Sequence, residues 1–203
     1  MKKIFLLTLG LALIAVSAGA GPIDFRDAAF APAMNQTTFS ITEDGFGLLF
    51  SAEPSGAKLW WDSADGFGVQ GPFGYEPDEI ETGEILRLDF VNPKPVMLKS
   101  IHITDLFSEF GYLEIGRIQV DTGEPIIIQG IELFGSSNGE LMVDVNLPAS
   151  FIRFTAPGLA FGGENHEFSV GGINIAKVPL PPAMLLLGSG VLGIIAVRRK
   201  VRR

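Results

Sequence analysis

The sequence predicts an all-β protein. Its body is expected to be an antiparallel β-sandwich of jelly-roll type, with an N-terminal signal peptide and one short C-terminal transmembrane helix. Apolar and polar residues alternate with a period of two in many short segments, as where Leu86, Leu88 and Phe90 flank Arg87 and Asp89. Turn-forming residues separate these segments, and no long amphipathic helix is expected between the two terminal apolar runs.

The expected strands share this alternation and are bounded by glycine, proline, asparagine or serine. They span residues 38–42, 46–52, 86–90, 98–104, 113–120, 125–134, 141–147, 151–155 and 167–175. Asp44-Gly45 and Asp65-Gly66 each precede a Phe-Gly pair and predict two hairpin ends, because glycine accepts positive φ. The alternation slips between Ile115 and Ile118, where Gly116 predicts a β-bulge.

The N-terminus has the layout of an export signal. Lys2 and Lys3 precede an apolar run over residues 4–16, and small residues follow it. We expect signal peptidase to cut after Ala20 once the chain has entered the Sec translocon, so that residues 1–20 are removed. A cut after Ala18 and an uncleaved N-terminal anchor are the alternatives.

The C-terminal 27 residues, 177–203, combine a proline-rich motif, an apolar run and a basic end. The run, residues 183–197, would reach about 22 Å as a helix, which is short of the roughly 30 Å hydrocarbon core of a bilayer. We therefore expect a temporary anchor that keeps the basic end in the cytoplasm. The motif consists of Val178, Pro179, Leu180, Pro181 and Pro182, and the basic residues are Arg198, Arg199, Lys200, Arg202 and Arg203.

This order of features resembles the PEP-CTERM sorting signal of Gram-negative bacteria. Leu180 stands where the namesake motif has Glu, as in the VPLPA subtype, and Pro182 intervenes before Ala183. The resemblance implies recognition and cleavage by exosortase, a membrane enzyme of bacteria that make extracellular polysaccharide. It also implies passage through the inner membrane to the cell surface or extracellular matrix. It covers residues 178–203 and implies nothing about the body, residues 21–176.

The net charge of the exported part limits the kinds of partner that it can bind. Between residues 21 and 182 there are eight basic residues against all 23 acidic ones, a net charge of −15. Such a surface repels nucleic acid and attracts divalent cations and basic partners. The chain has no cysteine, so its stability depends on a hydrophobic core without disulfides.

The densest polar segment is an acidic loop at residues 76–84, with five carboxylates in nine residues. Dense oxygen ligands suit calcium, and Asp78 and Glu79 are the expected ligands, with Asp62 and Asp65 contributing from the preceding loop. The alternative is a solvated acidic loop without an ion. No other cofactor is expected.

Aromatic residues near this loop offer a second interpretation. Trp60, Trp61 and Tyr75 could stack on sugar rings, which would make the body a carbohydrate-binding module. Alternation places Trp60 and Trp61 on opposite faces of a strand, so one is expected in the core.

No catalytic motif is found. His102 is expected in solvent and His166 in a turn, and neither has a metal-ligand partner at a recognised spacing. We expect a non-enzymatic structural or adhesive protein associated with exopolysaccharide or biofilm. A carbohydrate-binding module is the alternative, and a surface glycoside hydrolase with paired acids is the third.

Overall fold

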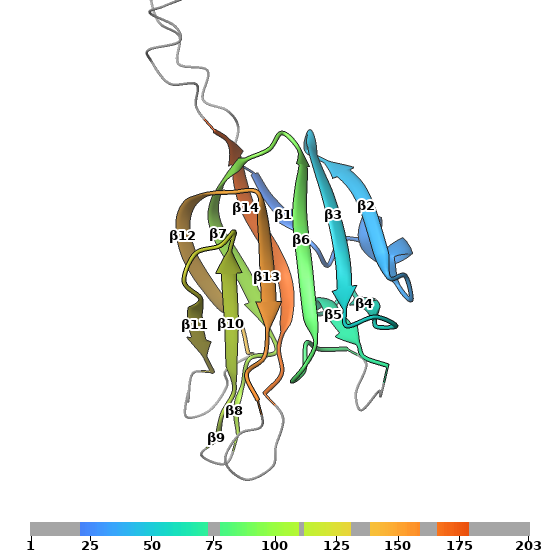
Figure 1. The fold of residues 1–203 in the computed structure, drawn as a ribbon, viewed down its shortest axis with the longest axis vertical. Helices are drawn as coiled ribbons and strands as arrows, with labels where there is room; N and C mark the ends of the chain where they lie inside the picture. The colour runs from blue at the N-terminus through green and yellow to red at the C-terminus, as the bar shows by residue number, and fades with distance from the viewer. Residues whose placement is uncertain (1–20, 73–77, 110–111, 131–138, 159–165, 179–203) are drawn as a thin grey trace, which may run out of the picture.

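A computed structural model describes residues 21–72, 78–109, 112–130, 139–158 and 166–178. Within these ranges the body is all-β, and two antiparallel sheets pack face to face as a sandwich (Figure 1). The predicted sandwich is therefore confirmed. The predicted signal peptide, transmembrane run and basic end lie outside the described residues, and so does the sorting motif except Val178.

The first sheet, sheet A, has the strand order β12-β7-β14-β5-β4, with β1 also paired to β14. Sheet B has the order β11-β10-β13-β6-β3-β2. Sheet A contains β1 (Gly21–Asp24), β4 (Lys58–Asp62), β5 (Gly66–Gln70), β7 (Val96–Thr104), β12 (Leu141–Ala149) and β14 (Ser169–Lys177). Sheet B contains β2 (Thr38–Glu43), β3 (Phe46–Glu53), β6 (Ile85–Asn92), β10 (Ile115–Val120), β11 (Ile126–Gln129) and β13 (Phe151–Thr155). A short hairpin joins β8 (Ser108–Glu109) to β9 (Tyr112–Leu113), and a 3-10 helix, η1, spans Ala28–Ala33.

The alternating sequence pattern places one face of each sheet in the core. In β6, Leu86, Leu88 and Phe90 are at most 1% exposed, whereas the alternate positions Arg87 and Asp89 are half-buried. Each large side chain buried in this way contributes about 1.5–3 kcal/mol to the free energy of folding. The core between the sheets is therefore the main source of stability in a chain without disulfides.

Four phenylalanines fill one part of this core. Phe25, Phe30, Phe50 and Phe67 are at most 1% exposed. Phe50 and Phe67 come from opposite sheets and stack with ring centroids 4.3 Å apart, while Phe25 contacts both edge-on. The segment after β1 and the helix η1 are held against the sandwich by these rings.

Both predicted hairpin ends are confirmed. Asp44 and Gly45 turn the chain from β2 to β3 with φ of 51° and 78°. Gly66 begins β5 with φ of 95°, and a Cβ there would collide with the carbonyl oxygen of Val170 on β14. The second turn therefore requires glycine for its backbone conformation and for its close approach to sheet A.

Some local expectations are wrong. Gly116 makes no bulge, because β10 pairs without interruption with β11 from Ile115 to Ile118. Gly116 is buried, and a Cβ there would come within 2.8 Å of Ile128 and Phe168, so these side chains occupy the space that a larger residue would need. Register shifts occur at other places, as in β12, where the pairing shifts after Asp144 and Leu147 is exposed. The sequence did not identify β1, and it gave no bounds for β4 and β5, although it placed Trp60 and Trp61 on a strand and a hairpin end at Asp65-Gly66.

Among the described residues, no helix has the length and apolar character needed to cross a membrane.

Candidate functional site

The outer face of sheet A carries a groove over four strands, lined by both apolar and polar residues. Strand register places the groove residues of β1, β14, β7 and β12 in two adjacent rows. The rows lie two residues apart along each strand, or roughly 7 Å. One row consists of Asp24, Gly172, His102 and Met142, and the next of Pro22, Asn174, Ser100 and Asp144. We call the pocket over these rows the outer-face groove; its volume is about 300 Å³ and it is lined by Pro22, Ile23, Asp24, Arg26, Ser100, His102, Met142, Gly171, Gly172, Ile173 and Asn174.

Two glycines in the middle of the groove are packed closely against the neighbouring strands. The register of β14 against β7 shifts between Val170 and Gly172, which makes Gly171 the extra residue of a bulge. A Cβ on Gly171 would lie 2.9 Å from the Thr104 side chain and 3.0 Å from His102 Nδ1. A Cβ on Gly172 would lie 2.6 Å from the carbonyl oxygen of Ile23 on β1. A side chain at either position would push the strands or the groove residues apart.

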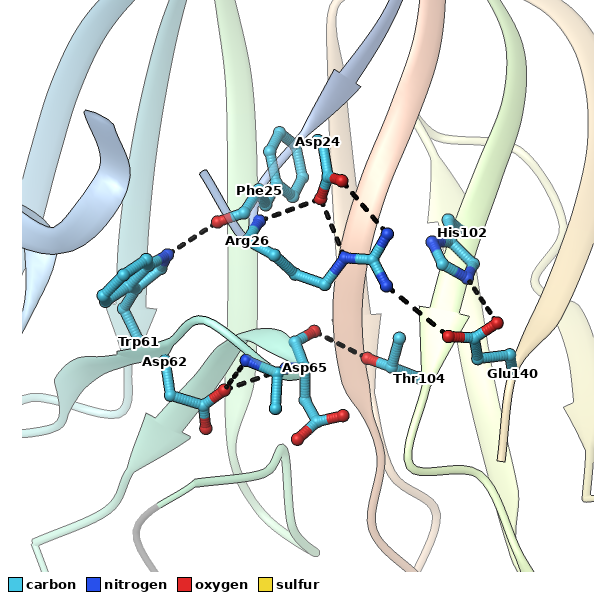
Figure 2. Close-up of polar contacts among 10 residues, drawn as sticks. Asp24, Phe25, Arg26, Trp61, Asp62, Asp65, His102, Thr104 and Glu140 are labelled. Carbon is cyan, nitrogen blue, oxygen red and sulfur yellow. Dashed lines mark hydrogen bonds and ion pairs between the residues drawn. The ribbon is translucent and has the colours of Figure 1, made fainter. Parts of the chain in front are cut away.

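A chain of ionic contacts crosses this face of the sheet (Figure 2). Arg26 donates from Nε to Asp24 Oδ1 at 2.9 Å and from Nη2 to Asp24 Oδ2 at 3.0 Å. Arg26 Nη1 also reaches Glu140 Oε1 at 3.5 Å, and Glu140 Oε2 lies 3.8 Å from His102 Nε2. The Arg26 hydrogen bonds lower the pKa of Asp24, so this carboxylate stays ionised. The guanidinium therefore links β1 to the start of β12.

Two further polar residues lie in the second row. Ser100 is 9% exposed, and it is paired in register with Asn174. Asn174 Oδ1 is buried and has no hydrogen-bond partner in the part of the chain that the structure describes. A buried amide oxygen without a donor costs folding free energy. The Asn174 oxygen therefore lacks the hydrogen-bond donor that such atoms normally have.

A carboxylate cluster, defined here as Asp62, Asp65, Asp78, Glu79 and Asp105, lies beside the groove. Asp62 Oδ1 accepts hydrogen bonds from the backbone amides of residues 64 and 65 at 2.7 and 2.8 Å (Figure 2). Thr104 Oγ1 donates to the Asp65 carbonyl at 2.6 Å, which fixes the turn before β5 to the end of β7. The carboxyl groups of Asp65 and Asp105 interact closely enough to alter each other's pKa.

The cluster retains protons near neutral pH. Burial raises the pKa of Asp105 to about 7, and repulsion from Asp65, Asp62 and Asp78 adds to this effect. Burial also raises the pKa of Glu79 to about 10, together with repulsion from Glu167, Asp105, Glu114 and Asp78. Burial is also the main cause of the raised pKa of Asp65. The folded protein therefore contains carboxyl groups whose ionisation costs free energy.

The residues expected to hold calcium lie within electrostatic range of one another. Asp78 and Glu79 interact electrostatically with each other, and Asp78 also interacts with Asp65. Sequence reasoning missed Asp105, because it lies 26 positions after Glu79 and joins the cluster only through sheet A. In the described ranges, no group of three or more His, Asp or Glu side chains has an arrangement suited to hold a metal ion. Calcium binding at Asp78 and Glu79 stays a prediction.

The two tryptophans expected to contact sugar are both half-buried. Trp61 packs against the core, and its Nε1 donates to the Phe25 carbonyl at 2.6 Å (Figure 2). Trp60 Nε1 is buried without a hydrogen-bond partner in the described part of the chain. Contact of Trp60 and Trp61 with sugar stays a prediction. Tyr75 lies outside the described residues.

The histidines occupy different surroundings from those expected. His102 lies in the outer-face groove with its side chain 17% exposed, rather than in open solvent. His166 is 6% exposed, and its Nδ1 accepts a hydrogen bond from the amide of Ile115 at 3.2 Å. Burial lowers the pKa of His166, so it is a neutral structural acceptor. Val178, the described residue of the sorting motif, is exposed at the end of β14.

Comparisons with known proteins identify no family for this chain. No protein-family model matches it, and no curated protein sequence matches it. Two crystal structures of the exo-β-1,3-galactanase of Phanerochaete chrysosporium, one with galactose and one of a variant with β-1,3-galactotriose, are similar at a TM-score of 0.39. Their identities are 13% and 12%; the alignments cover 68% and 70% of this chain but 29% of the galactanase. A likeness this distant indicates neither a ligand nor an activity.

Proposed function

We propose that this chain is an exported, non-enzymatic surface or matrix protein whose C-terminal tail is sorted and cleaved by exosortase. Its body, a sandwich of jelly-roll-like type, would serve a structural or adhesive role in an exopolysaccharide or biofilm matrix. The proposal assigns residues 178–182 to recognition and residues 198–203 to retention of the tail in the cytoplasm. The single observation in the fold that supports it is the pairing of β1 with β14.

That pairing places the two ends of the body side by side. Gly21, the first residue after the expected signal-peptidase cut, pairs with Ile175. Strand β14 ends at Lys177, directly before the proline motif. In Figure 1 the start of β1 and the end of β14 lie at the same end of sheet A. Both membrane-directed segments can therefore leave the body toward one membrane without crossing a sheet.

The same geometry orients the carboxylate cluster. Ser169, at the start of β14, pairs with Thr104, so Asp105 lies at the end of sheet A opposite to Gly21 and Lys177. A body held by its C-terminal tail would present this acidic end away from the bilayer. That orientation keeps the ionisable carboxyl groups away from anionic lipid headgroups and exposes them to the matrix.

A second candidate function, a carbohydrate-binding module, is favoured by the outer-face groove rather than by the tryptophans. The third, a glycoside hydrolase, gains no support from Asp65 and Asp105. Neither acid lines the outer-face groove, so the two do not flank the pocket in which a sugar would bind.

Mass spectrometry of the C-terminus tests the main proposal. The chain would be isolated from exosortase-competent cells and from cells that lack the enzyme. We expect loss of the segment after the proline motif only in competent cells. A variant with Pro179 and Pro181 replaced by Ala should remain uncut, whereas replacement of Pro125, in the body, should not affect cleavage. An intact Arg203 in both strains would contradict the proposal.

A further inference from the structure

We infer that the outer-face groove binds one neutral pyranose unit of a polysaccharide, with Asn174, Ser100 and the Asp24–Arg26 pair as its polar contacts. This inference goes beyond the sorting proposal and does not depend on the tail. It assigns the sugar contact to sheet A residues other than the two tryptophans that the sequence indicated.

The first argument is the unpaired oxygen of Asn174. This atom is buried at the groove without a donor in the described part of the chain, although nearly all buried polar atoms of folded proteins are paired. This oxygen has almost no accessible surface, so a ligand hydroxyl supplies the missing donor once the Asn174 side chain turns toward the groove. Ser100 is its register neighbour and both donates and accepts, so a hydroxyl that donates to Asn174 can also accept from Ser100.

The second argument is the pattern of donors and acceptors across the groove. Asp24 is held by Arg26, and its oxygens retain further lone pairs for ligand hydroxyls. The Asp24 row and the Asn174 row are roughly 7 Å apart, which allows hydroxyls on two sides of one sugar ring to bind at once. Because Arg26 fixes the Asp24 carboxylate, this acceptor is already oriented before the ligand arrives (Figure 2).

The third argument concerns size and apolar lining. A volume of about 300 Å³ is at the lower end of ligand pockets, which suits a single ring. Met142, which is 59% exposed, lies on β12 at one side of the groove, and Pro22 lies on β1 at the other side. These two residues can contact the C–H groups of a pyranose while the polar residues bind its hydroxyls.

Charge selects against acidic sugars. Asp24 and Glu140 both pair with Arg26, so these three ionised side chains together carry one net negative charge. Asp144, the register neighbour of Ser100, adds another at the exposed edge. Uronate, sulfate or phosphate groups would be repelled here, because no basic side chain of the groove is free to pair with them.

Saturation-transfer NMR on the full chain in detergent tests this inference. The probes are the methyl pyranosides of glucose, galactose and mannose, with methyl glucuronide as the anionic comparison and glucosamine as the cationic one. We expect at least one neutral pyranoside to bind with millimolar affinity and the glucuronide not to bind. Asn174→Ala should weaken binding by about tenfold. Gln129→Ala, an exposed amide on sheet B, is the matched control and should leave affinity unchanged.

A second pair of variants covers a failure of Asn174→Ala to fold. Met142 and Leu147 are both exposed apolar residues of β12, but only Met142 lines the groove. Met142→Ala should weaken pyranoside binding severalfold, and Leu147→Ala should not. Three results would each overturn the inference. They are equal effects of the two variants, binding of glucosamine or glucuronide alone, and no binding of any neutral pyranoside. Cleavage of the tail is measured separately, so a negative result here leaves the sorting proposal standing.

Discussion

The carboxylate cluster predicts that Asp105→Asn stabilises the protein at alkaline pH. Burial and neighbouring acids raise the pKa of Asp105 to about 7, from an ordinary value of 3.8. Asparagine has the same shape and tolerates the positive φ of 53° at this position. The substitution therefore removes the cost of ionising this residue in the folded state with little change in its packing.

The magnitude follows from the pKa difference. Three pKa units correspond to about 4 kcal/mol, since each unit is worth about 1.36 kcal/mol. Asp105 is half-buried, and solvent screening and coupling to Asp65 reduce this figure to about 1–2 kcal/mol. The folded-state pKa is raised, so the destabilisation begins above the unfolded pKa near 3.8 and is complete above about 7.

Urea unfolding at about pH 4 and about pH 8 measures this effect. We expect Asp105→Asn to match the wild type at the lower pH and to exceed its free energy of unfolding at the higher pH. Asp44→Asn is the matched control, because Asp44 also has positive φ but lies in the exposed turn between β2 and β3. Equal stabilisation at both pH values, or an equal gain from Asp44→Asn, would refute the electrostatic reasoning.

Three further predictions concern packing, hydrogen bonding and calcium. Gly116→Ala should lower the free energy of unfolding by about 1–3 kcal/mol, because its Cβ would enter filled space. Gly158→Ala, where a Cβ meets nothing within 4 Å, should be near neutral in the same urea experiment. Trp61→Phe should cost about 1–2 kcal/mol through loss of its 2.6 Å indole hydrogen bond, and near-equal urea midpoints would argue against that bond. Calcium should raise the unfolding temperature of the wild type more than that of a variant with Asp78→Asn and Glu79→Gln; no calcium effect on the wild type would exclude the predicted site.

Much of the secondary structure could be predicted because alternation is a local property. Leu86, Leu88 and Phe90 repeat at the period of a strand, and the structure buries all three. Asp-Gly pairs likewise specify turns through their own backbone preferences, and both predicted turns form. Ile23 and Phe25 alternate with Asp24 and Arg26 in the same way, but this run is short and directly follows the expected signal-peptide cut, so it was not recognised as a strand.

By itself, the sequence determined the all-β class and the acidic body, because composition and short-range periodicity encode them. Only the tertiary structure decided the outer-face groove, which joins Asp24, Ser100, Met142 and Asn174 from four separate strands. It likewise brought Asp105 to the carboxylate cluster. The physical reason is that strand order and register depend on packing between distant segments, and a shift of one residue moves every side chain to the opposite face.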